Sequence, residues 1–214
     1  LSGDPAAFAA HPEDSEEARR EPEHWRWRVL RSPVLAVVAP DREQSATSHS
    51  LTLHHPLRSR RTTDGSIMVD GTPTDCVILA VNALLEARPD LCFSGVNHGP
   101  NMGEDVLYSG TVAAAMEATV LGIPSVAISY AGANWESLDA WEDTLEDLMR
   151  QIISRKGTFP ETTLLNVNLP PVDPAEVRGV RVTALGKRRY SDSLTRALDP
   201  SGKEYFWIGG GSMS

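Results

Sequence analysis

The chain alternates between short apolar runs rich in β-branched residues and longer segments whose apolar residues recur at helical spacing. Runs of the first kind are typical of buried strands. Because strands that alternate with helices pair in parallel through right-handed crossovers, this order predicts an α/β fold with a mostly parallel sheet. The strands are predicted within Ser32–Pro40, Ser66–Asp70, Leu91–Asn97, Pro124–Tyr130 and Thr163–Pro171.

Three helices are predicted between these strands. The first follows a Gly-Thr-Pro turn, has Thr74 as its N-cap and stops near Arg88. The second covers Thr111–Leu121 and is followed by a glycine that suits a helix end. The third covers Trp135–Arg155, where the apolar spacing places Trp141 in the core rather than in a ligand site.

Three parts of the chain differ in character. Residues 1–31 form an atypical, highly charged N-terminal segment, and residues 32–180 carry the α/β pattern. Residues 181–214 have alternating β-type runs around the turn Asp199–Lys203, which predicts a β-hairpin arm. The sequence ends in GGGSMS, which provides no closing element of the fold.

The composition argues against several classes of protein. A net charge of −9 makes broad nucleic-acid binding a poor explanation, and the short basic runs Arg58–Arg61 and Lys187–Arg189 are better explained as solvated charge. No apolar run is long enough to span a bilayer, and the opening residues do not resemble a signal peptide. Cys76 and Cys92 are predicted to be buried free thiols, which favours a cytoplasmic location.

The stretch FSGVNHGPNMGEDVLYSGTVAAAMEA, residues 93–118, is rich in glycine just before a helix of small residues. Glycine is costly unless the backbone takes a left-handed turn or approaches another group closely. We expect that group to be a small anion such as phosphate, while a plain tight turn remains an equal explanation of the spacing alone. The stretch contains neither G-x-G-x-x-G nor a Walker A motif, which argues against dinucleotide and P-loop sites.

Three loops follow predicted strands at the carboxyl edge of the sheet, where open α/β sheets bind ligands. They carry Ser45, Gly71–Asp75 and Asn97–Thr111. Their hydroxyls, amides and backbone N–H groups suit a hard cation and phosphate oxygens. Taken singly, Ser45 is better explained as a cap or turn residue, and Asn97 as a residue that stabilises a left-handed turn.

Five blocks in this order resemble the SurE family, the stationary-phase survival proteins that are metal-dependent nucleoside monophosphate phosphatases. The resemblance covers about residues 34–208. The blocks are VAPDREQSATSHSLT (38–52), GTPTDCV (71–77), SGVNHGPNMGEDVLYSGTVAAAMEA (94–118), LGIPSVAIS (121–129) and LNVNLP (165–170).

The resemblance implies a Rossmann-like three-layer core with a protruding C-terminal β-hairpin, and homodimers or homotetramers formed through C-terminal arms. It implies a divalent cation, Mg²⁺ or Mn²⁺, with Ser45 and Asn97 as catalytic residues that bind the metal. The phosphate-binding residues that it implies are Gly99, Asn101, Ser109, Gly110 and Thr111.

The sequence departs from the family pattern at its beginning. The family's first strand is followed by NDDG, whose two aspartates bind the metal, and this chain contains no Asp-Asp pair. The opening LSGDP resembles the start of that motif, which makes Asp4 a metal ligand and puts Pro5 in place of the second acid. Without carboxylates, Ser45 and Asn97 offer only neutral oxygens, whereas divalent cations prefer one or two carboxylates. The family's closing GYVSITPL-type strand is also not found.

The predicted function is metal-dependent hydrolysis of nucleoside 5′- and 3′-monophosphates to nucleoside and phosphate. Its partners are nucleotides, with no membrane and no stable nucleic-acid complex. The alternative is a catalytically impaired SurE-like protein that binds a nucleotide or partner without turnover, and the missing acid pair favours it. An α/β ligand-binding domain unrelated to phosphate is a third hypothesis, which the block matches disfavour.

Overall fold

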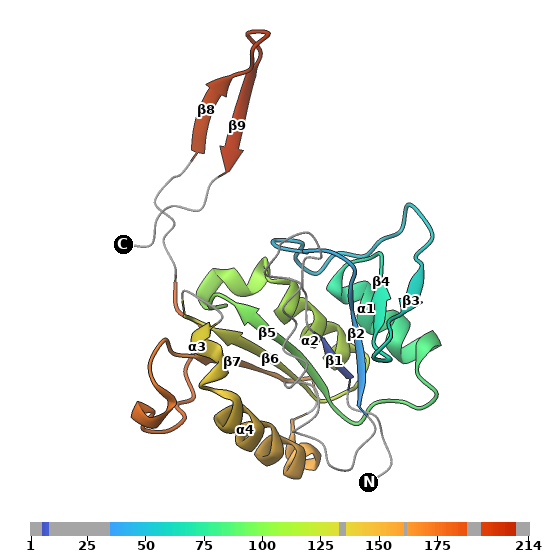
Figure 1. Cartoon of the computed structure of the whole chain (residues 1–214), viewed down its shortest axis with the longest axis vertical. Helices are drawn as coiled ribbons and strands as arrows, with labels where there is room; N and C mark the ends of the chain where they lie inside the picture. Colours follow the sequence, from blue (N-terminus) through green and yellow to red (C-terminus); the bar gives the residue numbers. More distant parts are fainter. Residues whose placement is uncertain (1–5, 9–34, 133–135, 161, 188–193, 209–214) are drawn as a thin grey trace.

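The computed structural model describes residues 6–8, 35–132, 136–160, 162–187 and 194–208 (Figure 1). The strands are β1 Ala6–Phe8, β2 Ala36–Pro40, β3 Ser59–Arg61, β4 Ile67–Val69, β5 Cys92–His98, β6 Ser125–Tyr130, β7 Leu164–Leu169, β8 Leu194–Leu198 and β9 Glu204–Ile208. The helices are α1 Pro73–Leu79, α2 Gly110–Val120, α3 Glu136–Asp139 and α4 Glu142–Ser154. Short π and 3₁₀ turns are η1 Ala80–Leu84, η2 Gly103–Leu107, η3 Lys156–Thr158 and η4 Pro174–Glu176.

The central sheet has seven strands in the order β3-β4-β2-β1-β5-β6-β7. All neighbouring pairs are parallel except β3 with β4, which places the single antiparallel strand at an edge. Without β3, the strand order is that of a doubly wound Rossmann sheet. The direction in which successive strands are added to the sheet reverses between β1 and β5. The predicted α/β fold is therefore confirmed, and the reversal marks the expected ligand side of the molecule. The strand β1, which fills the centre of the sheet, falls within the charged segment for which the sequence indicated no strand.

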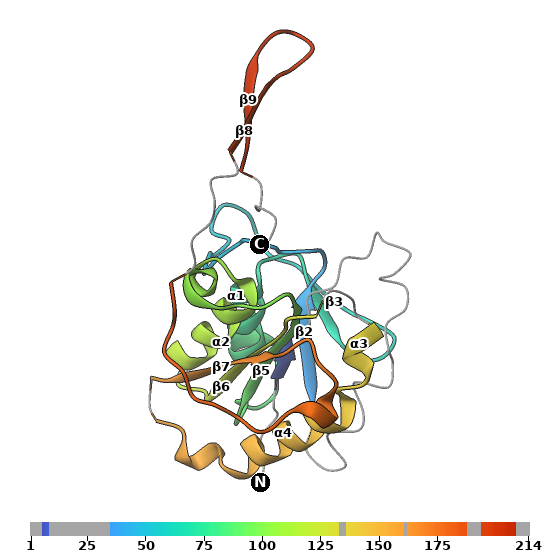
Figure 2. The same cartoon turned by 90° about the vertical axis from the view of Figure 1, so that its left-hand side faces the viewer.

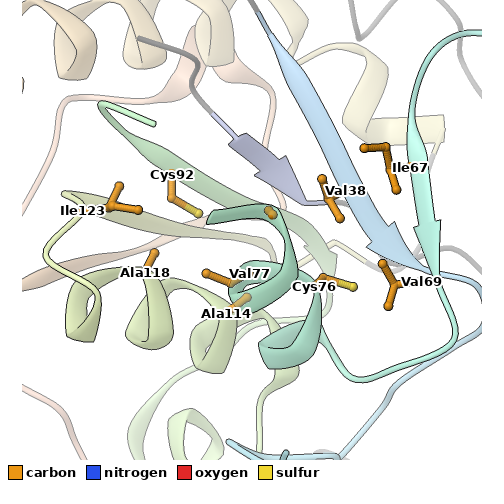
Figure 3. Packing of buried hydrophobic residues seen from close by; sticks show 10 residues of the cluster. Val38, Ile67, Val69, Cys76, Val77, Cys92, Ala114, Ala118 and Ile123 are labelled. Carbon is orange, nitrogen blue, oxygen red and sulfur yellow. The ribbon is translucent and has the colours of Figure 1, made fainter. Parts of the chain in front are cut away.

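Helices cover both faces of the sheet, and alternate residues of β5 show this directly. Cys92 belongs to a cluster with residues of β2, β4, α1 and α2, in which Val77 and Ala114 are also buried (Figure 3). Its neighbour Phe93 belongs to the cluster formed with α4 and its N-terminal residue Trp141. Because successive side chains of a strand point to opposite faces, α1 and α2 form one outer layer and α4 the other.

The two cysteines are part of this core, as the sequence predicted. Cys76 and Cys92 are free and buried, and burial raises the pKa of both thiols well above the usual value. The thiols therefore stay neutral and behave as small apolar side chains.

The start of α1 differs from the prediction. The N-cap is Thr72 rather than Thr74, because the Thr72 hydroxyl accepts a hydrogen bond from Asp75 N while the Asp75 side chain accepts one from the Thr72 backbone N–H. This reciprocal pair is a capping box, and Pro73 occupies the first helical position. Thr74 is instead fully buried in the first turn.

The end of this helical segment was also predicted wrongly. The helix passes through the π turn η1 and stops at Leu84, several residues before Arg88. Arg88 then lies outside the helix, where its guanidinium donates a hydrogen bond to the carbonyl of Leu121 at the end of α2. A carbonyl that α2 itself cannot satisfy is thereby paired.

The segment predicted as one helix over Trp135–Arg155 is divided into α3 and α4. The break lies at Ala140 and Trp141, where Trp141 N donates to Leu138 O. Trp141 is 1% exposed and its ring lies 6.3 Å from that of Tyr130, so the prediction that it is a core residue is confirmed.

The hairpin of β8 and β9 extends away from the core, as both views show (Figures 1 and 2). Its strands pair antiparallel from Leu194 with Ile208 to Leu198 with Glu204. The predicted turn Asp199–Lys203 joins them, with Asp199 N bonded to Lys203 O. In the described part of the chain, no helix combines the length and the apolar character needed to cross a membrane.

Candidate active site

Asn97 lies near the end of β5, where an irregularity in the backbone sets its position. The register of β5 against β6 shifts between Ser94 and Asn97. Gly95 lies within this shift at a φ of +120°, and a Cβ there would come within 2.2 Å of Ile128 O. Only glycine permits such a close approach. Beyond the shift, Asn97 Nδ2 donates to Gly99 O at 2.8 Å, which fixes the plane of the amide.

The N-terminus of α2 meets Asn97. Ser109 is the N-cap, and its hydroxyl accepts a hydrogen bond from Val112 N at 3.1 Å. Thr111 Oγ1 donates to Asn97 Oδ1 at 3.2 Å, which joins the first turn of the helix to the end of β5. The first N–H groups of a helix have no acceptor within the helix and favour anions. The N–H groups of Gly110 and Thr111 are therefore candidate donors to a phosphate.

The loop that carries Ser45 packs against the same helix start. Thr47 Oγ1 donates to Gln44 O at 2.9 Å, which closes the loop around Ser45. A Cβ built on Gly110 would lie 3.2 Å from Thr47 Oγ1 and 3.3 Å from Gln44 O, so this loop is in close contact with α2. Ser45 itself is exposed, and its hydroxyl donates to Glu43 Oε1 at 2.5 Å.

Asp75 ties the far end of this loop to α1. Its Oδ1 accepts a hydrogen bond from Thr52 N at 3.0 Å, and its Oδ2 accepts one from Thr72 N at 2.8 Å. Thr72 Oγ1 in turn donates to Ser50 O at 2.8 Å. Asp75 is only 3% exposed. Burial raises the pKa of Asp75, but the hydrogen bonds from Thr52 and Thr72 together lower the pKa by more than burial raises it. The pKa of Asp75 therefore lies below its usual value.

We expect Asp75→Asn to lower the free energy of unfolding at pH 7 by about 2 kcal/mol, because the backbone N–H of Thr52 or of Thr72, both half-buried residues, then faces an amide NH₂ instead of an oxygen. The folded-state pKa is depressed, so the stabilisation by the carboxylate is present above the unfolded pKa of about 3.9 and is lost as the pH falls through the folded pKa. Urea unfolding between pH 7 and pH 3 should therefore show the wild type and the variant converging below about pH 4.

The control for this variant is Asp173→Asn, which changes an exposed carboxylate that accepts a hydrogen bond from Ala175 N at a 3₁₀ turn. Its unfolding free energy should stay close to that of the wild type. A constant difference between Asp75→Asn and the wild type at all pH values would show that the carboxylate charge of Asp75 contributes nothing.

The structure brings together only some of the residues that the sequence singled out. A hydrogen bond joins Asn97 to Thr111 in the first turn of α2, and the Ser45 loop packs against Gly110 in the same turn. Gly99, at a φ of +101°, donates its N–H to Tyr130 O at 2.8 Å, so that donor is already used. Asp4 lies outside the described residues.

Asn101 points toward the sheet rather than toward the α2 terminus. It is 6% exposed, and its Nδ2 donates to Ser129 Oγ at 2.8 Å. Its backbone N–H donates to Asn168 Oδ1, and its carbonyl accepts from the side chains of Asn166 and Asn168. These bonds fix the glycine-rich loop to the ends of β6 and β7, a positioning contact that the sequence did not indicate.

Two contacts near the site differ from the predictions or were missed by them. The cap of α1 was expected at Thr74, whereas the Thr72-x-x-Asp75 pattern is the sequence signature of a capping box, so the cap could have been placed correctly. The pair His49–Glu117, with His49 Nε2 2.7 Å from Glu117 Oε2, joins residues 68 positions apart. No local pattern indicates such a contact.

Ser45 Oγ and Asn97 Oδ1 are hard oxygen atoms of the kind that Mg²⁺ and Mn²⁺ prefer. Both are neutral, and the described residues contain no cluster of three or more His, Cys, Asp or Glu side chains that could hold a metal ion. The two side chains thus fit a divalent cation in chemical type and make up only part of its shell.

The order of the strands defines a doubly wound α/β protein, and the polar loops at the β1–β5 reversal form a candidate anion site at the carboxyl edge of its sheet. Residues 27–192 match the family described as Survival protein SurE. The chain belongs to this family, as the resemblance of the five sequence blocks predicted.

Individual relatives agree with this assignment. The chain is 62% identical over 182 residues to the 5′-nucleotidase SurE of Gemmatimonas aurantiaca, covering 84% of this chain and 72% of that protein. It is 50% identical over 175 residues to the 5′-nucleotidase SurE of Methylococcus capsulatus, covering 82% and 69%. The crystal structure of the SurE protein from Aquifex aeolicus superposes with a TM-score of 0.78 at 38% identity, covering 96% of this chain and 82% of that one.

Proposed function

We propose that this protein is a nucleotidase that hydrolyses nucleoside 5′- and 3′-monophosphates to nucleoside and phosphate. The observation that carries the proposal is the contact of Thr111 Oγ1 with Asn97 Oδ1, which joins an anion-binding helix terminus to a candidate metal ligand. The 5′-nucleotidase names of relatives up to 62% identical support turnover rather than binding alone.

The residues of this chain bind the phosphate and hold it in place. The N–H groups of Gly110 and Thr111, at the positive end of α2, donate to phosphate oxygens and offset their charge. The hydrogen bond between Thr111 and Asn97 keeps the helix terminus and the amide oxygen in a fixed relation. Such preorganised donors favour the transition state because they need no rearrangement as charge shifts during the reaction.

The reaction is an in-line displacement at phosphorus. A water oxygen forms a bond to phosphorus as the bond between phosphorus and the nucleoside oxygen breaks. The proton that the water gives up balances the proton that the leaving oxygen takes up, so the nucleoside leaves as an alcohol. We propose that Ser45 and Asn97 hold a divalent cation, Mg²⁺ or Mn²⁺. When bound, such an ion polarises the phosphoryl group and lowers the pKa of a bound water.

The experiment that tests the proposal measures release of inorganic phosphate from AMP, GMP and 3′-AMP by the purified protein. With Mn²⁺ present, we expect turnover of the 5′-nucleotides and of 3′-AMP. Excess chelator should abolish it, and added Mn²⁺ should restore it. Tight nucleotide binding with no phosphate release would reject the nucleotidase proposal, and full activity in chelator would reject the metal.

The partners and surroundings of the protein belong to the same proposal. We propose a homodimer or homotetramer formed through the C-terminal arm, because apolar side chains of the hairpin such as Leu198 and Phe206 are exposed in the single chain. The buried, neutral thiols of Cys76 and Cys92 support a cytoplasmic location. Nucleoside monophosphates are the proposed small-molecule partners.

Gly110→Ala should lower phosphate release about tenfold with little loss of stability. The added Cβ would lie 3.0 Å from Pro73 Cγ and 3.2 Å from Thr47 Oγ1, so the α1 start and the Ser45 loop must move by tenths of an ångström. Alanine favours a helix over glycine by about 1 kcal/mol, which offsets part of this strain. The measurement is the steady-state rate with AMP together with urea unfolding.

Gly157→Ala is the matched control, because a Cβ at Gly157 meets nothing within 4 Å. It should leave the rate unchanged. An unchanged rate in Gly110→Ala as well would show that close packing of the Ser45 loop on α2 has no bearing on the reaction.

A further inference from the structure

The Ser45 loop is held by polar contacts, without an apolar side chain of its own in the core. Every residue from Asp41 to Ser50 is half-buried or exposed. Ala46 has a φ of +57° and Ser48 a φ of +56°, values that non-glycine residues adopt at a cost in free energy. A loop of this kind keeps one conformation only where the contacts around it over-determine it.

Besides the bond from Thr72 Oγ1 to Ser50 O at the far end of the loop, three contacts after Ser45 fix the loop to neighbouring segments. Ser48 N donates to Tyr108 O at 3.1 Å, and Ser48 Oγ donates to Leu107 O at 2.6 Å. These two acceptors belong to the turn before α2, in which no residue is buried between Gly103 and Leu107. They join one surface segment to another, so neither of these two bonds connects the loop to the core.

The third contact reaches the body of α2. His49 Nε2 lies 2.7 Å from Glu117 Oε2, with side-chain exposures of 32% and 12%. Hydrogen bonds to an ionised carboxylate are about twice as strong as neutral ones, and withdrawal from water strengthens them further. The neighbours of Glu117 on α2, Ala114 and Ala118, are fully buried, so the acceptor is on a rigid part of the fold.

We propose that His49 and Glu117 are positioning residues that hold the Ser45 loop in register with the N-terminus of α2. The helix that carries Glu117 also carries Thr111, which is bonded to Asn97. The His49–Glu117 pair therefore positions Ser45 relative to the same helix that positions Asn97. The two residues then do not depend on two loops that move independently. The effect on kcat rests on the proposed nucleotidase function. The His49–Glu117 contact itself, called the tether below, does not.

The test compares Glu117→Ala, Glu117→Gln and the control Glu146→Ala in the full chain. Glu146 forms a surface ion pair with Arg150 on α4, so its loss removes a similar carboxylate outside the tether. We expect Glu117→Ala to lower kcat for AMP about tenfold with KM nearly unchanged, and to speed amide hydrogen exchange in residues 43–48 at least about fivefold. Glu117→Gln should recover most of the rate, because its amide oxygen still accepts a hydrogen bond from His49.

Unchanged exchange and kcat in Glu117→Ala would overturn the proposal. So would a fall in kcat that glutamine does not rescue and that follows a general loss of melting temperature, because that pattern describes a merely structural residue. If the wild type releases no phosphate, the proposed function fails, and the hydrogen-exchange measurement still tests whether the tether exists. Faster exchange confined to residues 43–48 then supports it, and unchanged exchange overturns it.

Discussion

Replacing Asn97 by alanine should lower phosphate release from AMP by roughly 100-fold or more. Among the described residues, Asn97 is the candidate ligand that the structure joins directly to the α2 terminus, because its amide oxygen accepts a hydrogen bond from Thr111 Oγ1. The variant also loses the bond from Asn97 Nδ2 to Gly99 O, so the loop after β5 becomes less fixed. The initial rate of phosphate release with saturating Mn²⁺ measures the effect.

The fold should tolerate this change, because Asn97 is only half-buried. The melting temperature should fall by no more than a few degrees, and the matched control Asn82→Ala, which removes a bond to Ile78 O on the far part of the α1 segment, should keep the wild-type rate. A rate for Asn97→Ala within about threefold of the wild type would remove Asn97 from the site.

Gly95→Ala should destabilise the fold by about 3 kcal/mol or more, a large effect for a single methyl group. The added Cβ would come within 2.2 Å of Ile128 O, a backbone atom that cannot move without disturbing β6. The φ of +120° at Gly95 is also unfavourable for any residue with a side chain. Urea unfolding with a spectroscopic probe of the core tryptophan measures the loss.

Gly65→Ala separates the two causes. Gly65 has a φ of +88°, and a Cβ there meets nothing within 4 Å, so alanine suffers the conformational cost without the clash. We expect a loss of about 1 kcal/mol for Gly65→Ala. Equal losses in the two variants would mean that β5 and β6 do not approach each other as described, and the placement of Asn97 would then lack its structural basis.

The sequence predicted the strands and layers well because those signals are local. The buried runs that became β5 and β6 have the apolar character of strands covered on both faces, and the turn Asp199–Lys203 identified the hairpin. Element ends were less well predicted. The π turn η1 and the break before Trp141 were not predicted, because helical spacing alone does not locate an interruption within a helical segment.

The site was predicted in its residue types and only partly in its geometry. Block similarity and the position of strand ends singled out Ser45, Asn97 and the start of α2. Gly99 was predicted to bind phosphate, but in the structure its backbone N–H donates to Tyr130 O. The pair His49–Glu117 depends on the packing of distant segments, and such contacts leave no trace in a single sequence.

The most direct test of the account is the location of a bound Mn²⁺ ion by its anomalous scattering in crystals of this protein grown with Mn²⁺ and phosphate. The account predicts an ion at the carboxyl ends of the strands, coordinated by Asn97 Oδ1 and Ser45 Oγ, with phosphate at the N–H groups of Gly110 and Thr111. An ion bound elsewhere, or a phosphate at the α2 terminus with no ion beside Asn97, would contradict it.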